Sequence, residues 1–247
     1  MTTEALQSSE KHGALASPTP PPGAAEDWTI PQRWDELTAE DHWVWDTLFA
    51  RQMPYLGTRI VSPFLEGIPA LRLDTPGIPE LGALNARLAS LSGWSLVSVA
   101  GIVPDAAFFA MLATRKFPIG NFIRSAESLD YLEEPDFFHD IFGHVPMLSC
   151  PAIGRLMEAL GRLGVAAIAA DEGDAISRLY WHSVEFGLAR EGGEVKILGA
   201  GLASSFGEAH LALDGDVPQP RFTLKDAANT PYRNDRFQPL LFRRRFA

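Results

Sequence analysis

Apolar residues recur at helical spacing in several stretches of the chain, and residues typical of helix ends flank these stretches. Leucines at steps of three, four and three between residues 81 and 91 predict a helix that Pro79 opens and Gly93 ends. Thr38 is followed three residues later by Asp41, which resembles a capping box, and apolar residues follow at helical spacing. A helix is therefore predicted to begin near Thr38.

Two prolines mark the starts of further core helices. Pro104 opens a helix that carries Phe108, and Pro151 opens a helix that Gly164 closes. The apolar face predicted for this second helix consists of Ile153, Leu156, Leu160 and Leu163. The pattern is helical again from residue 171 to about residue 190.

Extended segments are short and few. Residues 94–99 and 195–198 are predicted strands, and the pair Gly192-Gly193 turns the chain into the second of them. No internal repeat is visible, and strands and helices do not alternate as a parallel α/β sheet requires. The sequence thus predicts a mainly α fold with a few short β strands.

The length and composition favour one compact domain. A domain commonly has roughly 100–200 residues, and this chain has 247, of which 46% are hydrophobic, too many for a chain disordered throughout. Residues 1–26 are rich in Ser, Ala, Thr and Pro and carry no periodic apolar face, so we expect a disordered leader there. The folded domain is expected to span residues 27–247.

Charge and cysteine content exclude several classes of partner. The formal net charge of −10 repels phosphate backbones and anionic lipid surfaces, so no nucleic acid and no membrane partner is expected. No apolar run approaches the ~18 residues of a membrane span, and the N-terminus lacks the pattern of a signal peptide. The single cysteine, Cys150, cannot form an intrachain disulfide or a thiolate zinc site. We therefore expect a cytoplasmic protein.

The densest cluster of chemically functional side chains lies at residues 133–146 and contains His139 and His144. Neutral imidazole is the commonest metal ligand among side chains, and iron or zinc sites combine two or three imidazoles with a carboxylate. On an ideal helix, residues five apart point about 140° away from each other, so a straight helix cannot aim both at one ion. Gly143 and Pro146 favour a helix end. We expect His139 in the last turns of a helix and His144 just past its end, swung back.

Two alternatives to a shared metal site remain open for these histidines. A zinc peptidase motif, His-Glu-x-x-His, places its ligands four residues apart with the Glu as base, whereas here the gap is five and the acid is Asp140. Alternatively, both histidines are hydrogen-bonded structural residues. The prolines and glycine around them disfavour that interpretation, because they cost helix propensity without improving packing.

Glu185 is the candidate for a third ligand, because it stands among apolar neighbours in residues 179–188. A buried carboxylate needs a partner, and a divalent cation is one of the few that offset the cost of burial. Two imidazoles and one carboxylate on one face of an ion leave the opposite positions open, as in non-haem Fe(II) oxygenases. The alternative partner is an arginine such as Arg178.

Motifs in order between residues 28 and 242 resemble the pterin-dependent aromatic amino acid hydroxylases, in particular the short bacterial phenylalanine 4-hydroxylases. The motifs are residues 117–124, 131–136, 139–146, 180–188, 199–208, 230–233 and 238–240. The resemblance implies one catalytic domain over residues 27–247. It also implies a monooxygenase that converts L-phenylalanine to L-tyrosine with O₂ and tetrahydrobiopterin, or a related tetrahydropterin, at a mononuclear Fe(II).

The resemblance also implies roles for individual residues. The implied iron site consists of His139, His144 and Glu185. Substrate contacts are implied for Arg124, which would hold the amino acid carboxylate, for Asp136, which would support that arginine, and for Trp181 and Ser204. Pterin contacts are implied for Gly101, Val103, Phe108, Asp140 and Tyr180. Asp140 stands where many members have Glu, and Leu132 stands where animal members have Thr.

Other interpretations remain beside this one. Without the resemblance, Phe108 is simply a core residue. The regulatory domain and tetramerisation helix of animal members find no room in this chain, so we expect an unregulated monomer with a small-molecule substrate. Two further functions stay open, namely tryptophan hydroxylation within the same family and catalytically silent binding of an aromatic amino acid.

Overall fold

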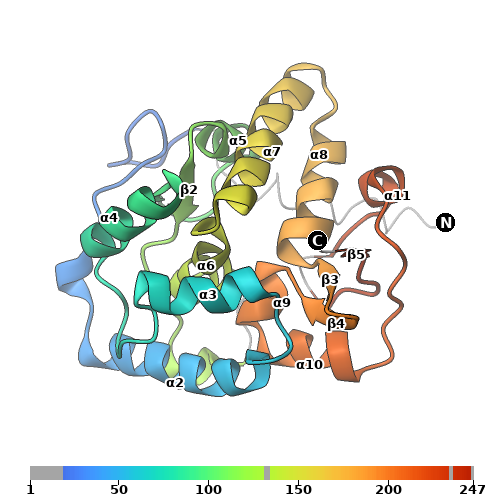
Figure 1. Cartoon of the computed structure of the whole chain (residues 1–247). Helices are drawn as coiled ribbons and strands as arrows, with labels where there is room; N and C mark the ends of the chain where they lie inside the picture. Colours follow the sequence, from blue (N-terminus) through green and yellow to red (C-terminus); the bar gives the residue numbers. More distant parts are fainter. Residues whose placement is uncertain (1–18, 131–133, 234–235, 246–247) are drawn as a thin grey trace.

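The computed structural model describes residues 19–130, 134–233 and 236–245, and its helices surround a central segment, residues 138–148 (Figure 1). The α-helices are α2 (Ala39–Leu56), α3 (Ser62–Leu71), α4 (Leu81–Ser92), α5 (Asp105–Ala113), α6 (Val145–Leu148), α7 (Pro151–Ala169), α8 (Gly173–Tyr180), α9 (Ala200–Ser204), α10 (Phe206–Asp214) and α11 (Leu224–Asn229). Short 3-10 turns are η1 (Trp34–Glu36) and η2 (Ala126–Ser128), and two π-helices are η3 (Phe138–His144) and η4 (Trp181–Glu185). The mainly α fold is confirmed.

The strands form two small sheets at the edges of the helical body. They are β1 (Ser95–Ser98), β2 (Lys116–Ile119), β3 (Leu188–Glu191), β4 (Glu194–Ile197) and β5 (Arg243–Arg245). β1 pairs with β2 in parallel, while β3 pairs antiparallel with β4 and parallel with β5. Gly192 and Gly193 both have positive φ, which is typical of the tight turn between antiparallel strands. Both predicted strands are confirmed to within one residue.

The helix ends predicted from local signals are largely confirmed. The hydroxyl of Thr38 accepts the Asp41 N–H at 3.2 Å, and the Thr38 N–H donates to the Asp41 carboxylate at 2.7 Å, so the capping box is complete at the start of α2. Gly93 ends α4 in the left-handed region with φ 76°. Pro79 lies just outside α4, whose first turn is capped instead by the Glu80 carboxylate.

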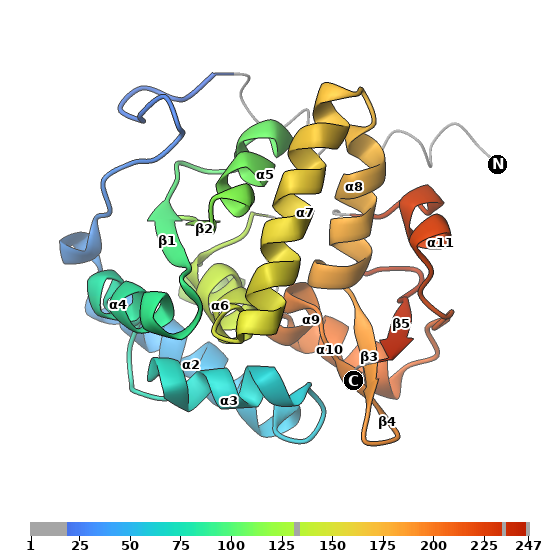
Figure 2. The same cartoon turned by 45° about the horizontal axis from the view of Figure 1, so that its top comes forward.

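The prediction for the helix that begins at Pro151 is wrong in its end and in half of its face, because Ile153 and Leu160 pack against the core whereas Leu156 and Leu163 are exposed. The helix α7 continues through Gly164 to Ala169, and Leu163 is 58% exposed. Its buried residues are Gly154, Met157, Gly161 and Gly164. Glycines line this face because α5 packs directly along it, and α8 lies on another side (Figure 2). A Cβ on Gly161 would lie 2.3 Å from the backbone nitrogen of Ala113.

We expect Gly161→Ala to lower the free energy of unfolding by about 1–3 kcal/mol, because the methyl group would force α5 and α7 apart. Helix propensity alone predicts the opposite sign, a gain of about 1 kcal/mol. The exposed Ala159 on the same helix offers a matched control, since Ala159→Gly changes propensity without a clash. Urea unfolding of both variants checks this. A more stable Gly161→Ala protein would contradict the close approach.

The helix predicted from residue 171 to about residue 190 ends earlier than expected, at Glu185. The chain leaves the helical conformation at Phe186, and residues from Leu188 onward form β3. Leu188 and Ala189 are fully buried because β3 lies between β4 and β5. A run of buried apolar residues fits a helix and a central strand equally well, so periodicity did not separate them.

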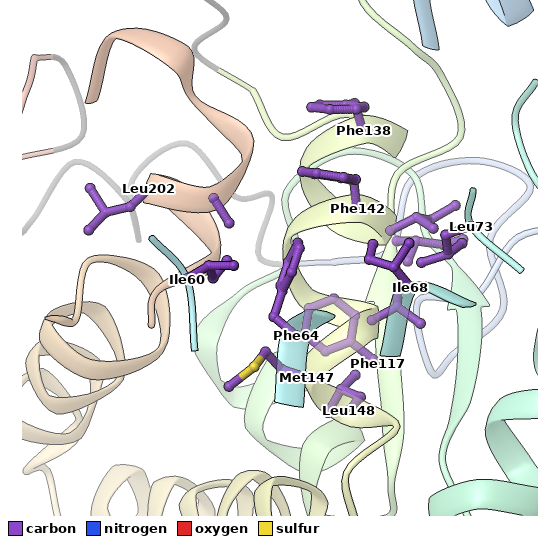
Figure 3. Close-up of a cluster of buried hydrophobic side chains, with 14 of the residues drawn as sticks. Ile60, Phe64, Ile68, Leu73, Phe117, Phe138, Phe142, Met147, Leu148 and Leu202 are labelled. Atoms are coloured by element: carbon purple, nitrogen blue, oxygen red, sulfur yellow. The ribbon is translucent and has the colours of Figure 1, made fainter. Parts of the chain in front are cut away.

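The centre of the molecule is the continuous helical segment η3–α6, which contacts α3, α7, α9 and β2. Phe138 and Phe142 stack on each other at 4.6 Å between ring centroids on one side of this segment (Figure 3). Trp45 and Phe64 meet these two rings edge-on at 5.4 Å each. This apolar contact fixes the rotation of the segment about its axis, and hence the direction in which its polar side chains point.

Two sequence expectations fall partly or wholly outside what the structure describes. Residues 1–18 of the predicted leader are not described, and residues 19–26 form turns that lead to the bridge between Thr29 and Val99. Leu132 also lies outside the described residues. In the described part of the chain, no helix has both the length and the apolar character that crossing a membrane requires.

Candidate metal centre and active site

A π-helix solves the spacing problem of His139 and His144. Residues 138–144 form a π-helix, in which backbone hydrogen bonds join residues five apart, so the two imidazoles lie on the same side. The helix does not end at Gly143, and His144 does not swing back from beyond an end, so that expectation is wrong. Gly143 instead allows close approach of α9, since a Cβ there would lie 2.9 Å from the Ala200 carbonyl oxygen.

Glu185 joins the two histidines from the second π-helix. Its Oε1 lies 3.1 Å from Nε2 of His144, and its Oε2 lies 3.6 Å from Nε2 of His139. The two Nε2 atoms are 3.3 Å apart, and all three ligand atoms lie within 4.8 Å of one another. The residues predicted as a metal site from their chemistry therefore converge.

Arg178 is not the partner of Glu185. Its guanidinium donates to the Asp174 carboxylate at 3.4 Å and to the Ala228 carbonyl oxygen at 3.3 Å. The alternative interpretation of Glu185 as half of an ion pair with this arginine is wrong. Glu185 faces the two imidazoles, so the cluster provides metal ligands and no permanent cation.

Ser204 determines which nitrogen of His139 is available. The Ser204 hydroxyl donates its proton to the Ala200 carbonyl oxygen at 2.9 Å, so it accepts from Nδ1–H of His139, also at 2.9 Å. This tautomer leaves a lone pair on Nε2, the atom that faces His144 and Glu185. Such a hydrogen bond to a ligand imidazole is typical of metal sites.

The protonation states of His139 and Glu185 match those of metal ligands. Burial lowers the pKa of His139 to about 4, so its imidazole is neutral near pH 7. Burial opposes the charge of Glu185, but its contacts with the imidazoles outweigh that effect and lower its pKa to about 2. An ionised carboxylate and neutral imidazoles are the forms that bind a metal. Two imidazole nitrogens and a carboxylate at these distances fit a divalent ion.

We expect Ser204→Ala to weaken iron binding by about 10–100-fold, because His139 would lose the hydrogen bond that fixes its tautomer and ring orientation. Iron affinity is measured by competition with a chelator of known strength. The matched control is Ser183→Ala, whose hydroxyl donates to backbone carbonyls of its own helix and touches no ligand imidazole. Equal iron affinities in the two variants would contradict this role for Ser204.

A cavity of about 270 Å³ lies beside the three ligand atoms. Of the residues predicted from the sequence to form the site, the cavity is lined by Gly101, Val103, Phe108, Arg124, His139, Asp140, His144, Tyr180, Trp181, Glu185 and Ser204. Asp136 is fully buried behind Arg124 instead of lining the cavity. The structure thus places these predicted residues, which are spread between positions 101 and 204, around one cavity.

Arg124 and Asp136 form a buried, doubly bonded ion pair. Nε of Arg124 donates to Oδ2 of Asp136 at 2.7 Å, and Nη2 donates to Oδ1 at 3.0 Å. Asp136 also accepts the backbone N–H of His139 at 3.0 Å, so the pair is tied to the metal cluster. Among the described residues, no group accepts from Nη1 of Arg124, which leaves that donor for the cavity.

The aromatic side of the cavity contains the residues predicted to contact a pterin. Phe108 meets Tyr180 edge-on at 5.1 Å, and it is only partly buried, unlike a core residue. Asp140 accepts the Gly120 N–H at 2.7 Å, and burial raises its pKa to about 7. Burial, followed by the charge of Glu185, raises the pKa of Tyr180 well above its usual value. This wall is therefore aromatic, with protonatable groups beside the metal cluster.

The sequence did not single out several residues of this cavity. Phe117 lies against the His144 ring at 4.7 Å, and Tyr232 stacks on Trp181 at 4.2 Å. Asp105 and Ser177 also line the cavity. Phe117 and Tyr232 stand inside motifs noted above, which is a signal that could have identified them. Asp105 and Ser177 stand outside every motif, so only the fold reveals them.

Two imidazoles and one carboxylate on one face of a metal position, beside an aromatic cavity, define the class of mononuclear non-haem metal enzymes with open coordination positions. The chain belongs to the biopterin-dependent aromatic amino acid hydroxylases, because the model of that family matches residues 29–245. The resemblance inferred from the motifs is thereby confirmed.

Individual relatives agree with this assignment. The phenylalanine-4-hydroxylase of Caulobacter vibrioides is 46% identical over 224 residues, which cover 90% of this chain and 76% of that protein. A crystal structure of Chromobacterium violaceum phenylalanine hydroxylase with bound iron(III) and oxidised cofactor 7,8-dihydrobiopterin matches with a TM-score of 0.86 at 40% identity, covering 96% of this chain and 85% of that one. Its iron- and phenylalanine-bound form matches with a TM-score of 0.85 at 38% identity and the same coverage.

Proposed function

We propose that this protein is a phenylalanine 4-monooxygenase that forms L-tyrosine from L-phenylalanine at a mononuclear iron, with a tetrahydropterin and O₂. The observation that carries the proposal is the convergence of His139, His144 and Glu185 beside a cavity that is also lined by Arg124. Several bacterial phenylalanine-4-hydroxylases, 39–46% identical to the chain, support the choice of substrate.

His139, His144 and Glu185 are the residues that would hold the iron. They approach the metal position from two π-helices, so the opposite side of that position faces the cavity. When bound there, iron(II) and a tetrahydropterin supply the activation of O₂ that ring hydroxylation requires. The three ligand side chains need not transfer a proton, since their role is to fix the ion beside the substrate.

Arg124 is the residue that would bind the substrate carboxylate. Asp136 holds the guanidinium by two hydrogen bonds and leaves Nη1 without an acceptor among the described residues, which suits a charge-assisted contact with a carboxylate in the cavity that Arg124 lines. Trp181 and Ser204 line the same cavity. Anchoring the amino acid at one end fixes the distance of its ring from the metal position, which is what an oxidation of one ring carbon requires.

Phe108, Tyr180 and Asp140 would form the pterin side, together with the backbone near Gly101 and Val103. Phe108 offers a partly exposed aromatic face, and Asp140 offers a carboxyl group that can accept or donate a hydrogen bond near pH 7. Asp140 is shorter than the Glu of many family members, so a water between its carboxyl group and the pterin fits this chain. Apolar rings such as Phe117 keep other water from the metal position.

The setting of the enzyme follows from its surface and its cysteine content. We place it in the cytoplasm as a monomer, with small molecules as its ligands and with no nucleic acid or membrane as partner. The net charge of −10 and the unpaired Cys150 support this. Gel filtration with light scattering tests the monomer, and a mass near 54 kDa, twice 27.0 kDa, would show a dimer instead.

The test of the proposed function is product analysis with the purified protein. Loaded with Fe(II) and given tetrahydrobiopterin and O₂, it should convert phenylalanine to tyrosine in amounts that match the pterin consumed. Tryptophan, offered side by side, tests the rival hydroxylase activity, because pocket shape decides which ring is accepted. Faster 5-hydroxytryptophan formation would favour that rival. Phenylalanine binding without iron or product would favour a silent binding protein.

A further inference from the structure

The N-terminal segment, residues 25–30, joins the end of β1 at the point where the chain enters the wall of the cavity. The N–H of Ile30 donates to the Ser98 carbonyl oxygen at 2.9 Å, and Thr29 forms an antiparallel bridge with Val99. Val99 and residues 101–103 line the cavity and lead into α5. The N-terminal segment therefore holds this part of the wall from its far side.

Trp28 is the buried residue of the N-terminal segment. It is 9% exposed and forms, with Val99, Val103 and Met111, a small cluster of buried apolar residues that is separate from the main core. Phe108 packs against this cluster while it remains partly buried. A satellite cluster of this kind depends on its own few members, and the indole contributes the largest apolar surface among them.

The backbone at Trp28 has a conformation that bulky side chains avoid. Its φ is 70°, in the left-handed region, which is unfavourable for a residue of this size. The turn around it is fixed by Asp27, whose Oδ1 accepts the Thr29 hydroxyl at 2.7 Å, and by the Trp28 N–H, which donates to the Ala25 carbonyl oxygen at 2.9 Å. Strained residues persist where the surrounding contacts compensate for the strain. For Trp28 those contacts are with the wall of the cavity.

We propose that Trp28 is a positioning residue for the pterin, because it holds residues 99–103 and the first turns of α5 in place from outside the cavity. This inference rests on the proposed function, since it requires a pterin beside Phe108. Trp28 is not one of the residues that line the cavity, so it acts only through Val103 and Phe108. The iron ligands lie on other elements, η3 and η4, and do not depend on this cluster.

The test measures the binding of an oxidised pterin, so that its result does not depend on turnover. Iron-loaded wild-type protein and Trp28→Ala are titrated by calorimetry with 7,8-dihydrobiopterin, and separately with phenylalanine. If the wall adopts its binding conformation in about one tenth of the molecules, the apparent affinity falls about tenfold. We expect Trp28→Ala to bind dihydrobiopterin at least about tenfold more weakly, with unchanged iron content and phenylalanine affinity. In turnover, the KM for tetrahydrobiopterin should rise while the KM for phenylalanine stays the same.

Further variants separate positioning from general stability. Trp28→Phe keeps an aromatic ring in the cluster and should restore most of the dihydrobiopterin affinity. The matched control is Leu56→Ala, which removes a fully buried side chain of the main core outside this cluster. It should lower the midpoint of urea unfolding and leave the dihydrobiopterin affinity unchanged. Urea unfolding also shows that each variant is folded under the conditions of the titration, and Trp28→Leu, which leaves a smaller cavity, replaces Trp28→Ala if the latter is not.

Each outcome decides the inference. Equal dihydrobiopterin affinity in wild-type protein and in the folded Trp28 variants would overturn the inference and leave the proposed function standing. Wild-type protein that binds no pterin would overturn the proposed function itself. An equal loss of phenylalanine or iron affinity in Trp28→Ala, or the same loss of dihydrobiopterin affinity in Leu56→Ala, would show that the indole stabilises the whole domain and does not position the pterin.

Discussion

Replacing Glu185 by glutamine should abolish stoichiometric iron binding and phenylalanine hydroxylation together. The amide has the size of the carboxylate but no charge, so the ion would face two neutral imidazoles without a compensating anion. We expect hydroxylation to fall at least about 1000-fold, corresponding to about 4 kcal/mol in the activation barrier. Metal analysis after gel filtration gives the iron content, and tyrosine formation gives the activity.

Glu208 offers a matched control for this substitution. It is another acid of the same cavity, and burial raises its pKa to about 7, but it accepts a backbone N–H from Gln238 and is not among the groups that converge on the metal position. Glu208→Gln should therefore retain one iron per chain. Retained iron and turnover in Glu185→Gln would show that this ligand is misassigned, and His144→Ala then tests the histidines independently.

Asp136→Asn should produce a large loss of stability. It leaves the guanidinium of Arg124, which is 8% exposed, without its counter-charge. Breaking a buried ion pair by removing one partner costs about 3–5 kcal/mol in the free energy of unfolding. The substitution should also raise the KM for phenylalanine, because the guanidinium loses one of the two hydrogen bonds that orient it and meets an amide N–H in its place. Urea unfolding and steady-state kinetics measure the two effects.

The exposed pair of Arg51 and Asp130 provides the comparison. Nη2 of Arg51 lies 2.6 Å from Oδ1 of Asp130, but the Asp130 side chain is 84% exposed. Exposed pairs contribute about 0–1 kcal/mol, so Asp130→Asn should leave the unfolding free energy nearly unchanged. Similar losses of unfolding free energy in the two variants would mean that burial does not increase the contribution of the Arg124–Asp136 pair to stability. A stable Asp136→Asn protein with an unchanged KM for phenylalanine would contradict the role of Arg124 in binding the substrate.

The parts of the fold that the sequence predicted well are those with local causes. Thr38 and Asp41 make their capping box from neighbouring residues alone, and the left-handed conformation at Gly93 needs no distant partner. The buried face of α7 could not be predicted in this way. Gly161 and Gly164 become interior residues only because α5 approaches them. The sequence of the helix by itself favours the leucines as the buried face.

The same distinction between local and distant causes applies to the residues of the site. His139, His144 and Glu185 could be selected from chemistry, because an acid among apolar residues and two nearby imidazoles need a common partner. The path of the backbone between the histidines could not, since an α-helix and a helix end were the only options that local propensities offered. Arg124 was implied by family resemblance alone. Asp105 on α5 and Ser177 on α8 are 72 residues apart in sequence, and no local pattern connects them.

The π-helix that contains His139 and His144 limits which sequence changes this enzyme can accept during evolution. A single inserted or deleted residue within Phe138–His144 would move one imidazole off the ion while the stacked rings of Phe138 and Phe142 hold the other in place. Point substitutions can be absorbed by neighbours, but a change of length cannot. Active descendants of this gene should therefore vary in many side chains here and never in the number of residues.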